Sequence, residues 1–432
     1  MFPNQYPNPQ QPGYPPQGAP GFSAPPVYPP GGAGMYPPAA GYPAAGFTTA
    51  HPQAPMGYGA APPCMLPAGY PTAAALQQAP AGYGVVSSGY PAGHPGQPVQ
   101  GAQPLNASAL SESLLGYKQI PSIKAEKFDA QTDAQILRKA MKGIGTDEAA
   151  IINVLTKRTN KQRIEIVTAF KGSYGKDLIK DLKSELSGRL EKVAIALVTP
   201  RNEYLAQRLY KAMEGLGTKE STLIDILCTS SNAEIKAIKD TYQKLYKKPL
   251  ESDISGDTSG HFCRLLTSLL TATRDETPVG DPSKATQDAE ALYRAGEKKV
   301  GTDESTFNMI LTGRSWPQIR LILDAYTKVS HGNTLEKAIK SEFSGDITAG
   351  LLAIVKVARN KAAYFAERLH DSVAGMGTND SDLIFICVTR AEVDMENIKK
   401  EYLKMYHKTV AQAISGDTSG DYKKILLGLV GH

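Results

Sequence analysis

The sequence predicts an all-α protein in which four repeated units follow a long tail without charged residues. A glycine loop recurs four times, and in three copies a series of apolar residues at helical spacing follows the loop. The first 111 residues, by contrast, contain no Asp, Glu, Lys or Arg. No segment of the repeated region alternates polar and apolar residues as a half-buried strand would. We therefore expect helices throughout the repeats.

The tail, residues 1–111, carries 25 of the 31 prolines and 9 of the 21 tyrosines of the chain. Tyr-Pro units recur along it, for example at Tyr14-Pro15 and Tyr90-Pro91. Prolines prevent a continuous helix, and large aliphatic residues are too few to form a core. We expect a disordered, low-complexity segment that mediates self-association or binds protein partners; a spacer without a partner is the alternative. Residues 112–126 are expected to form a junction.

An acidic residue follows each glycine loop at a nearly fixed distance. The loops are Gly143-Ile144-Gly145-Thr146, Gly215-Leu216-Gly217-Thr218, Lys299-Val300-Gly301-Thr302 and Gly375-Met376-Gly377-Thr378. The acids Glu185, Asp257 and Asp417 come 40 residues after the last glycine, and Glu342 comes after 41. Glycines allow carbonyl oxygens to converge on one point, and calcium takes six to eight such oxygens together with carboxylates. The pattern predicts a calcium site in each copy.

The apolar series show that a whole unit is repeated, because they shift along the chain by the same distances as their loops. The members are Ile235, Ile238, Tyr242 and Leu245; Ile319, Ile322, Tyr326 and Val329; and Met395, Ile398, Tyr402 and Met405. Each series marks one face of an amphipathic helix. Each copy then ends in Ser-Gly before another apolar stretch, which predicts the start of a further helix.

These loops and distal acids resemble those of the annexin family over about residues 127–430, and the Tyr/Pro/Gly-rich tail resembles that of synexin-like members. The resemblance implies four stacked five-helix repeats in a curved disc, with calcium loops on the convex face. We expect the repeats at residues 127–197, 198–272, 283–358 and 359–432.

The resemblance also implies which groups hold calcium: three backbone carbonyls and one carboxylate in each copy. In copies one, two and four these residues are Met141, Gly143, Gly145 and Glu185; Met213, Gly215, Gly217 and Asp257; and Val373, Gly375, Gly377 and Asp417. Copy three departs, because Lys299 stands where the first glycine is expected. Its longer loop resembles that of other third repeats, which implies Gly296, Lys299, Gly301 and Glu342.

The function implied by the resemblance is calcium-dependent peripheral binding to anionic phospholipid membranes. A helical-repeat scaffold for protein partners and a calcium-permeable channel are the alternatives. Arginines near the end of the second helix of three repeats, Arg158, Arg314 and Arg390, would line a pore, but the second repeat has Ser230. This departure weakens the channel interpretation.

No enzyme is expected. Two Asp-Thr-Ser-Gly segments, at Asp257 and Asp417, resemble aspartic-protease motifs, but they lie between helical patterns and not on a β scaffold. The segment Gly172 to Lys176 is too short for a nucleotide-binding phosphate loop, and Asp177 replaces the required hydroxyl residue.

The formal net charge of +5 is mild, and both signs are interleaved, so no specific nucleic-acid binding is expected. The chain starts without a signal-peptide pattern, and no apolar run reaches the roughly 18 residues of a transmembrane helix. We expect a cytoplasmic protein, recruited to membranes when calcium rises, with its four cysteines as free thiols.

Overall fold

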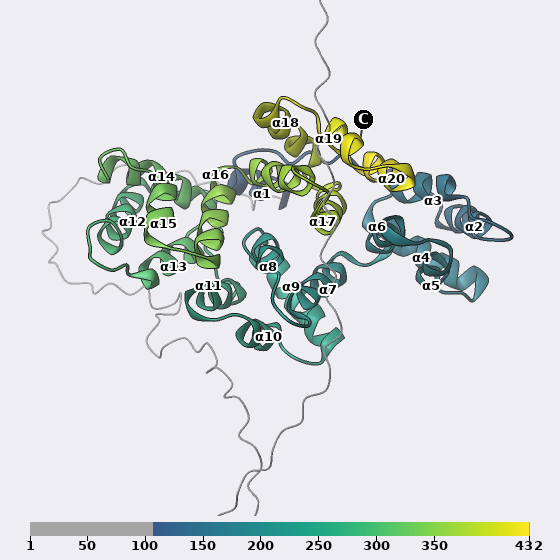
Figure 1. Cartoon of the computed structure of the whole chain (residues 1–432), viewed down its shortest axis with the longest axis horizontal. Coiled ribbons are helices and arrows are strands. Elements are labelled where there is room, and N and C mark those ends of the chain that lie inside the picture. Colours follow the sequence, from purple (N-terminus) through teal and green to yellow (C-terminus); the bar gives the residue numbers. More distant parts are fainter. Residues whose placement is uncertain (1–106, 432) are drawn as a thin grey trace, which may run out of the picture. The chain divides into compact units, whose positions relative to one another are not determined.

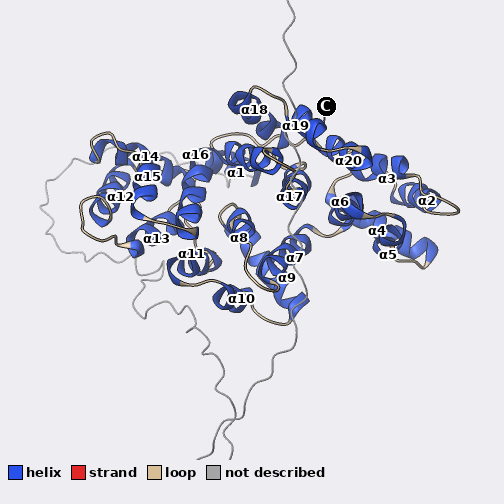
Figure 2. Cartoon of the chain, viewed as in Figure 1, coloured by secondary structure: helices blue, strands red, loops and turns tan. Residues whose placement is uncertain are grey.

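The computed structural model describes residues 107–431, and within this range every regular element is a helix (Figures 1 and 2). The predicted all-α fold is confirmed for these residues. The predictions for the tail concern residues 1–111 and lie almost wholly outside the described residues.

Helix α1, Ala107–Leu115, precedes the repeats. The first repeat contains α2 (Ala130–Ala140), α3 (Glu148–Thr156), α4 (Asn160–Tyr174), α5 (Leu178–Glu185) and α6 (Gly188–Val198). The second contains α7 (Arg201–Met213), α8 (Glu220–Leu227), α9 (Asn232–Tyr246), α10 (Leu250–Asp257) and α11 (Gly260–Leu270). The third begins with α12 (Pro282–Ala295), α13 (Glu304–Gly313), α14 (Trp316–Val329) and α15 (Leu335–Glu342). The fourth ends with α17 (Asp380–Arg390), α18 (Met395–Tyr406), α19 (Val410–Asp417) and α20 (Gly420–Val430).

Helix α16, Asp346–Val373, belongs to two repeats. Its backbone is interrupted at Asn360, which is extended, with φ −161° and ψ 101°. The segment before Asn360 is the fifth helix of the third repeat, and the segment after it is the first helix of the fourth. Each repeat therefore has the five helices that the family resemblance implied.

The core confirms most of the apolar series. Their first three members are buried in all three repeats, as in Ile235, Ile238 and Tyr242 of α9. The prediction that the fourth member lies on the buried face is wrong in two repeats, because Leu245 and Met405 are each 40% exposed. Both lie one residue before the end of their helix. Helical spacing predicts a face, but it does not show where that face stops being covered.

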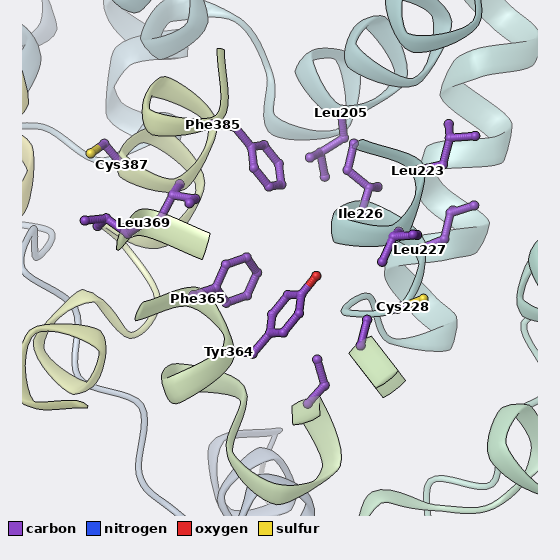
Figure 3. Close-up of a cluster of buried hydrophobic side chains, with 14 of the residues drawn as sticks. Leu205, Leu223, Ile226, Leu227, Cys228, Tyr364, Phe365, Leu369, Phe385 and Cys387 are labelled. Atoms are coloured by element: carbon purple, nitrogen blue, oxygen red, sulfur yellow. The ribbon is translucent and has the colours of Figure 1, made fainter. Parts of the chain in front are cut away.

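Contacts between repeats join the units into one core. Helices α3 and α6 of the first repeat pack against α20, and α6 also packs against α17. In the second repeat, α8 and α11 pack against α16. Figure 3 shows side chains from different repeats within one buried cluster, including Leu205, Ile226, Phe365 and Phe385. This packing fixes the helix ends on which the glycine loops are held.

The Ser-Gly pairs lie at helix starts, as predicted. Helices α6, α11 and α20 begin at the glycine, and α16 begins one residue after Gly345. Trp316 is buried under the Arg274 guanidinium, whose carbon lies 4.0 Å from the ring centre. No helix in the described range is long and apolar enough to cross a membrane.

The cysteine prediction holds for two of the described positions. Cys228 and Cys387 are free and buried, and burial raises the pKa of each thiol to about 12. Cys263, in the first turn of α11, is disulfide-bonded, so the prediction of a free thiol is wrong there. Spacing along the sequence does not show which sulfur atoms come within bonding distance.

The junction before the first repeat is held on the fourth repeat. The Ser122 hydroxyl donates to the Leu429 carbonyl at 2.6 Å, and the Ile120 amide donates to Asn397 Oδ1 at 2.8 Å. The Tyr117 hydroxyl donates to Asp394 at 3.3 Å. The segment that leads out of the tail is therefore part of the folded unit.

Candidate functional site: four glycine loops

Each of the four loops is closed by an equivalent backbone hydrogen bond. We name them loop 1 (141–147), loop 2 (213–219), loop 3 (296–303) and loop 4 (373–379). The amide of the last residue in each donates to the carbonyl of the residue just before the loop: Asp147 to Ala140, Lys219 to Ala212, Asp303 to Ala295 and Asn379 to Ser372, at 2.7–2.9 Å. The bond spans seven residues in loops 1, 2 and 4 and eight in loop 3, which confirms that loop 3 is longer.

The glycines adopt backbone angles that other residues rarely reach. The second glycine of every loop has φ between 83° and 88°, and the first glycine of loops 1, 2 and 4 has φ between 98° and 117°. Lys299 of loop 3 is not among the described non-glycine residues with positive φ. The extra residue therefore gives loop 3 a different path, along which a lysine is tolerated without left-handed strain.

At Gly296 it is the lack of space for a side chain, and not the backbone angle, that favours glycine. It takes the place of Met141, Met213 and Val373 at the start of its loop, and a Cβ atom there would lie 3.2 Å from the Phe307 ring. The same Cβ would lie 3.3 Å from Cγ of Glu342. The Gly296 carbonyl already accepts the Lys299 amide at 2.9 Å, which leaves one lone pair of that oxygen for another contact.

A threonine joins each loop to its distant acid. The Thr146 hydroxyl donates to Glu185 Oε2 at 2.7 Å, and the Thr302 hydroxyl donates to Glu342 Oε2 at 2.6 Å. Thr378 lies 2.8 Å from Asp417 Oδ2 and 3.2 Å from the carbonyl of the same residue. In loop 2, Thr218 donates to the Asp257 carbonyl at 3.0 Å. The structure thus brings each predicted acid to its predicted loop.

The role of these threonines was missed by the sequence reasoning. The signal was present, because a threonine follows the last glycine in all four copies. The spacing showed that it recurs, but not that its hydroxyl reaches a residue about 40 positions away.

Each loop also exposes one large apolar side chain at its tip. Ile144, Leu216, Val300 and Met376 are fully exposed, at 104–109% of the reference area. They stand between residues whose carbonyls are the predicted ligands. The other exposed large apolar side chains of residues 107–431 reach at most 78%, so the four loop tips differ from the rest of the described surface.

The acid of loop 2 has an additional charged neighbour. Partial burial and the Asp253 carboxylate raise the pKa of Asp257, and Lys248 opposes them. Asp253 itself accepts from the Tyr242 hydroxyl and pairs with Lys248 at 2.7 Å. In the fourth repeat the residue equivalent to Asp253 is Ala413.

The donors at the loops suit calcium better than a transition metal. No cluster of three or more His, Cys, Asp or Glu residues suitable for a metal occurs in residues 107–431. Each loop instead offers backbone carbonyls on a glycine-rich segment and one acid that the loop threonine binds. The threonine reaches the carboxylate of the acid in loops 1, 3 and 4 and its backbone carbonyl in loop 2. Such an all-oxygen, carbonyl-rich donor set is the type that calcium takes. The individual ligand assignments remain predictions.

The three arginines considered for a pore are all paired. Arg158 Nε lies 2.6 Å from Asp133, Arg314 Nε lies 2.8 Å from Asp288, and Arg390 Nη2 lies 2.6 Å from Asp394. Ser230, at the fourth equivalent position, donates to the Ile226 carbonyl at 2.7 Å. These arginines are engaged in ion pairs within their own repeats.

Comparison with known proteins agrees with this architecture. A family model described as annexin matches residues 132–197, 204–269, 287–354 and 364–429. Annexin A7 of Homo sapiens is 47% identical over 364 residues, which cover 81% of this chain and 74% of that protein. Annexin A13 of Homo sapiens is 47% identical over 316 residues, 73% of this chain and all of that protein.

Solved structures show the same fold. Chicken annexin V has 46% identity and a TM-score of 0.68, covering 73% of this chain and 99% of its own. A calcium-bound annexin, (Sm)1, has 36% identity and a TM-score of 0.68, covering 75% of this chain and 97% of its own. The four matched repeats, the closed glycine loops and these relatives lead to one conclusion: the chain belongs to the annexin family, whose members bind calcium.

Proposed function

We propose that this protein binds anionic phospholipid membranes in a calcium-dependent manner through loops 1 to 4. One observation carries the proposal: every loop places a fully exposed apolar side chain beside its predicted carbonyl ligands and a hydrogen-bonded distal acid. In loops 1, 3 and 4 the threonine hydroxyl binds the carboxylate of that acid. A lipid surface offers both complements of this arrangement, since phosphate oxygens complete the shell of a bound cation while the interface receives the apolar tip.

Calcium supplies positive charge between the carboxylate and the lipid phosphate. The protein's part is to hold carbonyls and one carboxylate together and to leave the outer side open. Each loop provides only one charged ligand, so a single site without lipid is weak. Four such loops in one chain raise the overall affinity, because binding at one makes binding at the next intramolecular. The protein is then soluble at low calcium and membrane-bound when calcium rises.

Vesicle sedimentation tests this proposal. The full chain is mixed with phosphatidylserine vesicles and with neutral phosphatidylcholine vesicles, each with calcium or with a chelator. The matched variant carries Glu185→Gln, Asp257→Asn, Glu342→Gln and Asp417→Asn together. We expect sedimentation of the wild type only with anionic vesicles and calcium, and none of the variant. Wild-type sedimentation by a variant with an unchanged helical circular-dichroism spectrum would refute the proposal.

For the tail we propose self-association or the tethering of protein partners. Its composition, uncharged and rich in Tyr and Pro, supports this role. A chain that begins at Ala107 keeps α1 and the contacts of Tyr117, Ile120 and Ser122, whereas a cut at Lys124 would remove them. We expect the chain from Ala107 to bind vesicles normally but to aggregate them less. Equal aggregation, with no partner lost in a pull-down, would reduce the tail to a spacer.

The two alternatives predict different outcomes in the same assays. A scaffold for protein partners would not sediment with anionic vesicles when calcium is added. A calcium channel would conduct across a planar bilayer, and the pairing of Arg158, Arg314 and Arg390 offers no support for it. Cytoplasmic localisation with calcium-driven recruitment follows from the proposal and is tested by imaging a tagged full-length chain before and after calcium is raised.

A further inference from the structure

The first repeat places an arginine where the other repeats place an apolar core residue. Arg163 of α4 precedes the buried pair Ile166 and Phe170 with the same offsets that place Ile235 before Ile238 and Tyr242. The third and fourth repeats have Ile319 and Met395 at this position. All three apolar residues are buried, and so is Arg163, which is 1% exposed.

The hydrogen bonds of Arg163 leave part of its guanidinium without a partner. Nε donates to the Leu155 carbonyl at 2.7 Å, and Nη1 donates to Glu392 Oε1 at 2.9 Å. Nη2 is buried and has no hydrogen-bond partner within residues 107–431. Burial lowers the pKa of this guanidinium, and the carboxylate of Glu392 opposes that effect.

Glu392 binds a second group besides Arg163. Its two carboxylate oxygens also accept the Asn160 backbone amide, at 2.9 and 2.8 Å, at the first residue of α4. One carboxylate therefore serves both the start of the helix and the buried cation. A second acceptor is missing on the Nη2 side, and leaving a buried donor without one costs free energy.

A cavity of about 200 Å³ lies where these groups meet, between the first, second and fourth repeats. Its lining includes Asn160, Arg163, Thr199, Arg201, Thr389 and Glu392. The volume is far larger than one water molecule needs. The lining carries two guanidinium groups and one carboxylate, so it has an excess of positive charge.

The remaining polar groups of the lining do not provide the missing acceptor. The hydroxyls of Thr199 and Thr389 donate to the carbonyls four residues earlier, those of Ile195 and Phe385. Arg201 donates through Nη1 to the Thr389 carbonyl at 2.7 Å and reaches Glu234 through Nη2 only at 3.5 Å. The Arg201 side chain is 33% exposed, so solvent reaches this side of the cavity.

We propose that this cavity is a binding site for a small oxyanion of the phosphate class, held by Arg163 and Arg201. A guanidinium presents donors in a planar fork that matches the oxygens of phosphate, and an oxyanion supplies several acceptors to Nη2 and Arg201 at once. Water would satisfy Nη2 alone, whereas an oxyanion accepts from Nη2 and Arg201 together; each guanidinium otherwise pairs with one carboxylate, Glu392 at 2.9 Å and Glu234 at 3.5 Å. The site is separate from loops 1 to 4 and does not depend on calcium.

The test uses the full chain in chelator-containing, calcium-free buffer, so that failure of the calcium proposal does not affect the result. Inorganic phosphate is titrated in a calorimeter, with potassium chloride at equal ionic strength as the blank. Glycerophosphoserine is titrated in parallel and distinguishes a lipid headgroup from free phosphate. We expect one saturable site per chain for at least one of these two ligands.

The decisive variant is Arg163→Ile, which installs the residue found at this position in the second and third repeats. We expect it to weaken binding at least tenfold. Arg294→Ile is the matched control, because Arg294 is an exposed arginine that pairs with Glu290 on the surface of α12. This control should bind as the wild type does.

Glu392→Gln gives an independent test that retains Arg163. Removing the competing carboxylate charge should strengthen phosphate binding about threefold or more, which a purely structural role of Arg163 would not produce. Absence of saturable binding in the wild type, or equal binding by the wild type and Arg163→Ile, would overturn the proposal and leave a cavity filled by water only. If Arg163→Ile fails to fold, unchanged or weaker binding by Glu392→Gln overturns it in the same way.

Discussion

Loops 2 and 4 carry the same motif, yet the structure holds their acids differently. Both have Gly-x-Gly-Thr followed by Asp after 40 residues. Thr378 reaches the carboxylate of Asp417, whereas Thr218 reaches only the carbonyl of Asp257. Asp257 also has the Asp253 carboxylate as a neighbour, where the fourth repeat has Ala413. The motif thus determines which groups can bind calcium. Residues outside the motif determine whether the carboxylate is already oriented toward the loop before calcium binds.

Two single-loop proteins allow the comparison to be tested. The loop 2 protein retains Asp257 and carries amides at the other three acids, and the loop 4 protein retains only Asp417. In both, the quantity measured is the calcium concentration that gives half-maximal sedimentation with phosphatidylserine vesicles.

The largest effect is expected from the feature that the two loops share. Leu216→Ser in loop 2 and Met376→Ser in loop 4 remove fully exposed apolar tips. If each tip is partly buried in the lipid interface, its loss costs about 1 kcal/mol, or about a fivefold higher calcium requirement, in both proteins. A loss in only one loop would mean that the two loops do not contact the membrane in the same way.

A smaller and unequal effect is expected from the threonines. Thr378→Val removes a hydrogen bond to a carboxylate and should raise the calcium requirement of the loop 4 protein about threefold. Thr218→Val removes a hydrogen bond to a carbonyl only and should change the loop 2 protein less than about twofold. Equal effects would show that orientation of the carboxylate by threonine does not distinguish the loops.

The smallest effect is expected from the neighbouring charge. Asp253→Ala in the loop 2 protein removes a negative charge near the site and frees Lys248 from its ion pair. Both changes disfavour a bound cation, so the calcium requirement should rise about twofold at low salt and less at high salt. The reciprocal Ala413→Asp should lower the requirement of the loop 4 protein. A decrease on Asp253→Ala would contradict this electrostatic account.

The sequence predicted the fold well because its signals were local and repeated. Helical spacing identified buried residues such as Ile238 and Ile322, and the common shift of loops and helices showed a repeated unit. The approach of each acid to its loop was also predicted, since four copies of one spacing imply one geometry. The exposure of Leu245 was not predicted, because it depends on where a helix ends relative to its neighbours.

Other features depend on contacts between distant segments. The hydroxyl of Thr146 reaches Glu185 across three helices, which no local pattern shows. Arg163 lies on the buried face of α4, and its partner Glu392 comes from the fourth repeat. The spacing of apolar residues identified the equivalent buried positions in the other three repeats. It gave no indication that the first repeat has a cation at this position.

The central claim is that loops 1 to 4 are calcium sites, and a crystal structure of the protein grown with calcium tests it most directly. Anomalous difference density identifies the cation without reference to any functional assay. The account predicts a peak at loop 4, coordinated by the carbonyls of Val373, Gly375 and Gly377 and by the Asp417 carboxylate, with equivalent peaks at the other loops. Loops without a peak at saturating calcium, or calcium bound only elsewhere, would contradict it.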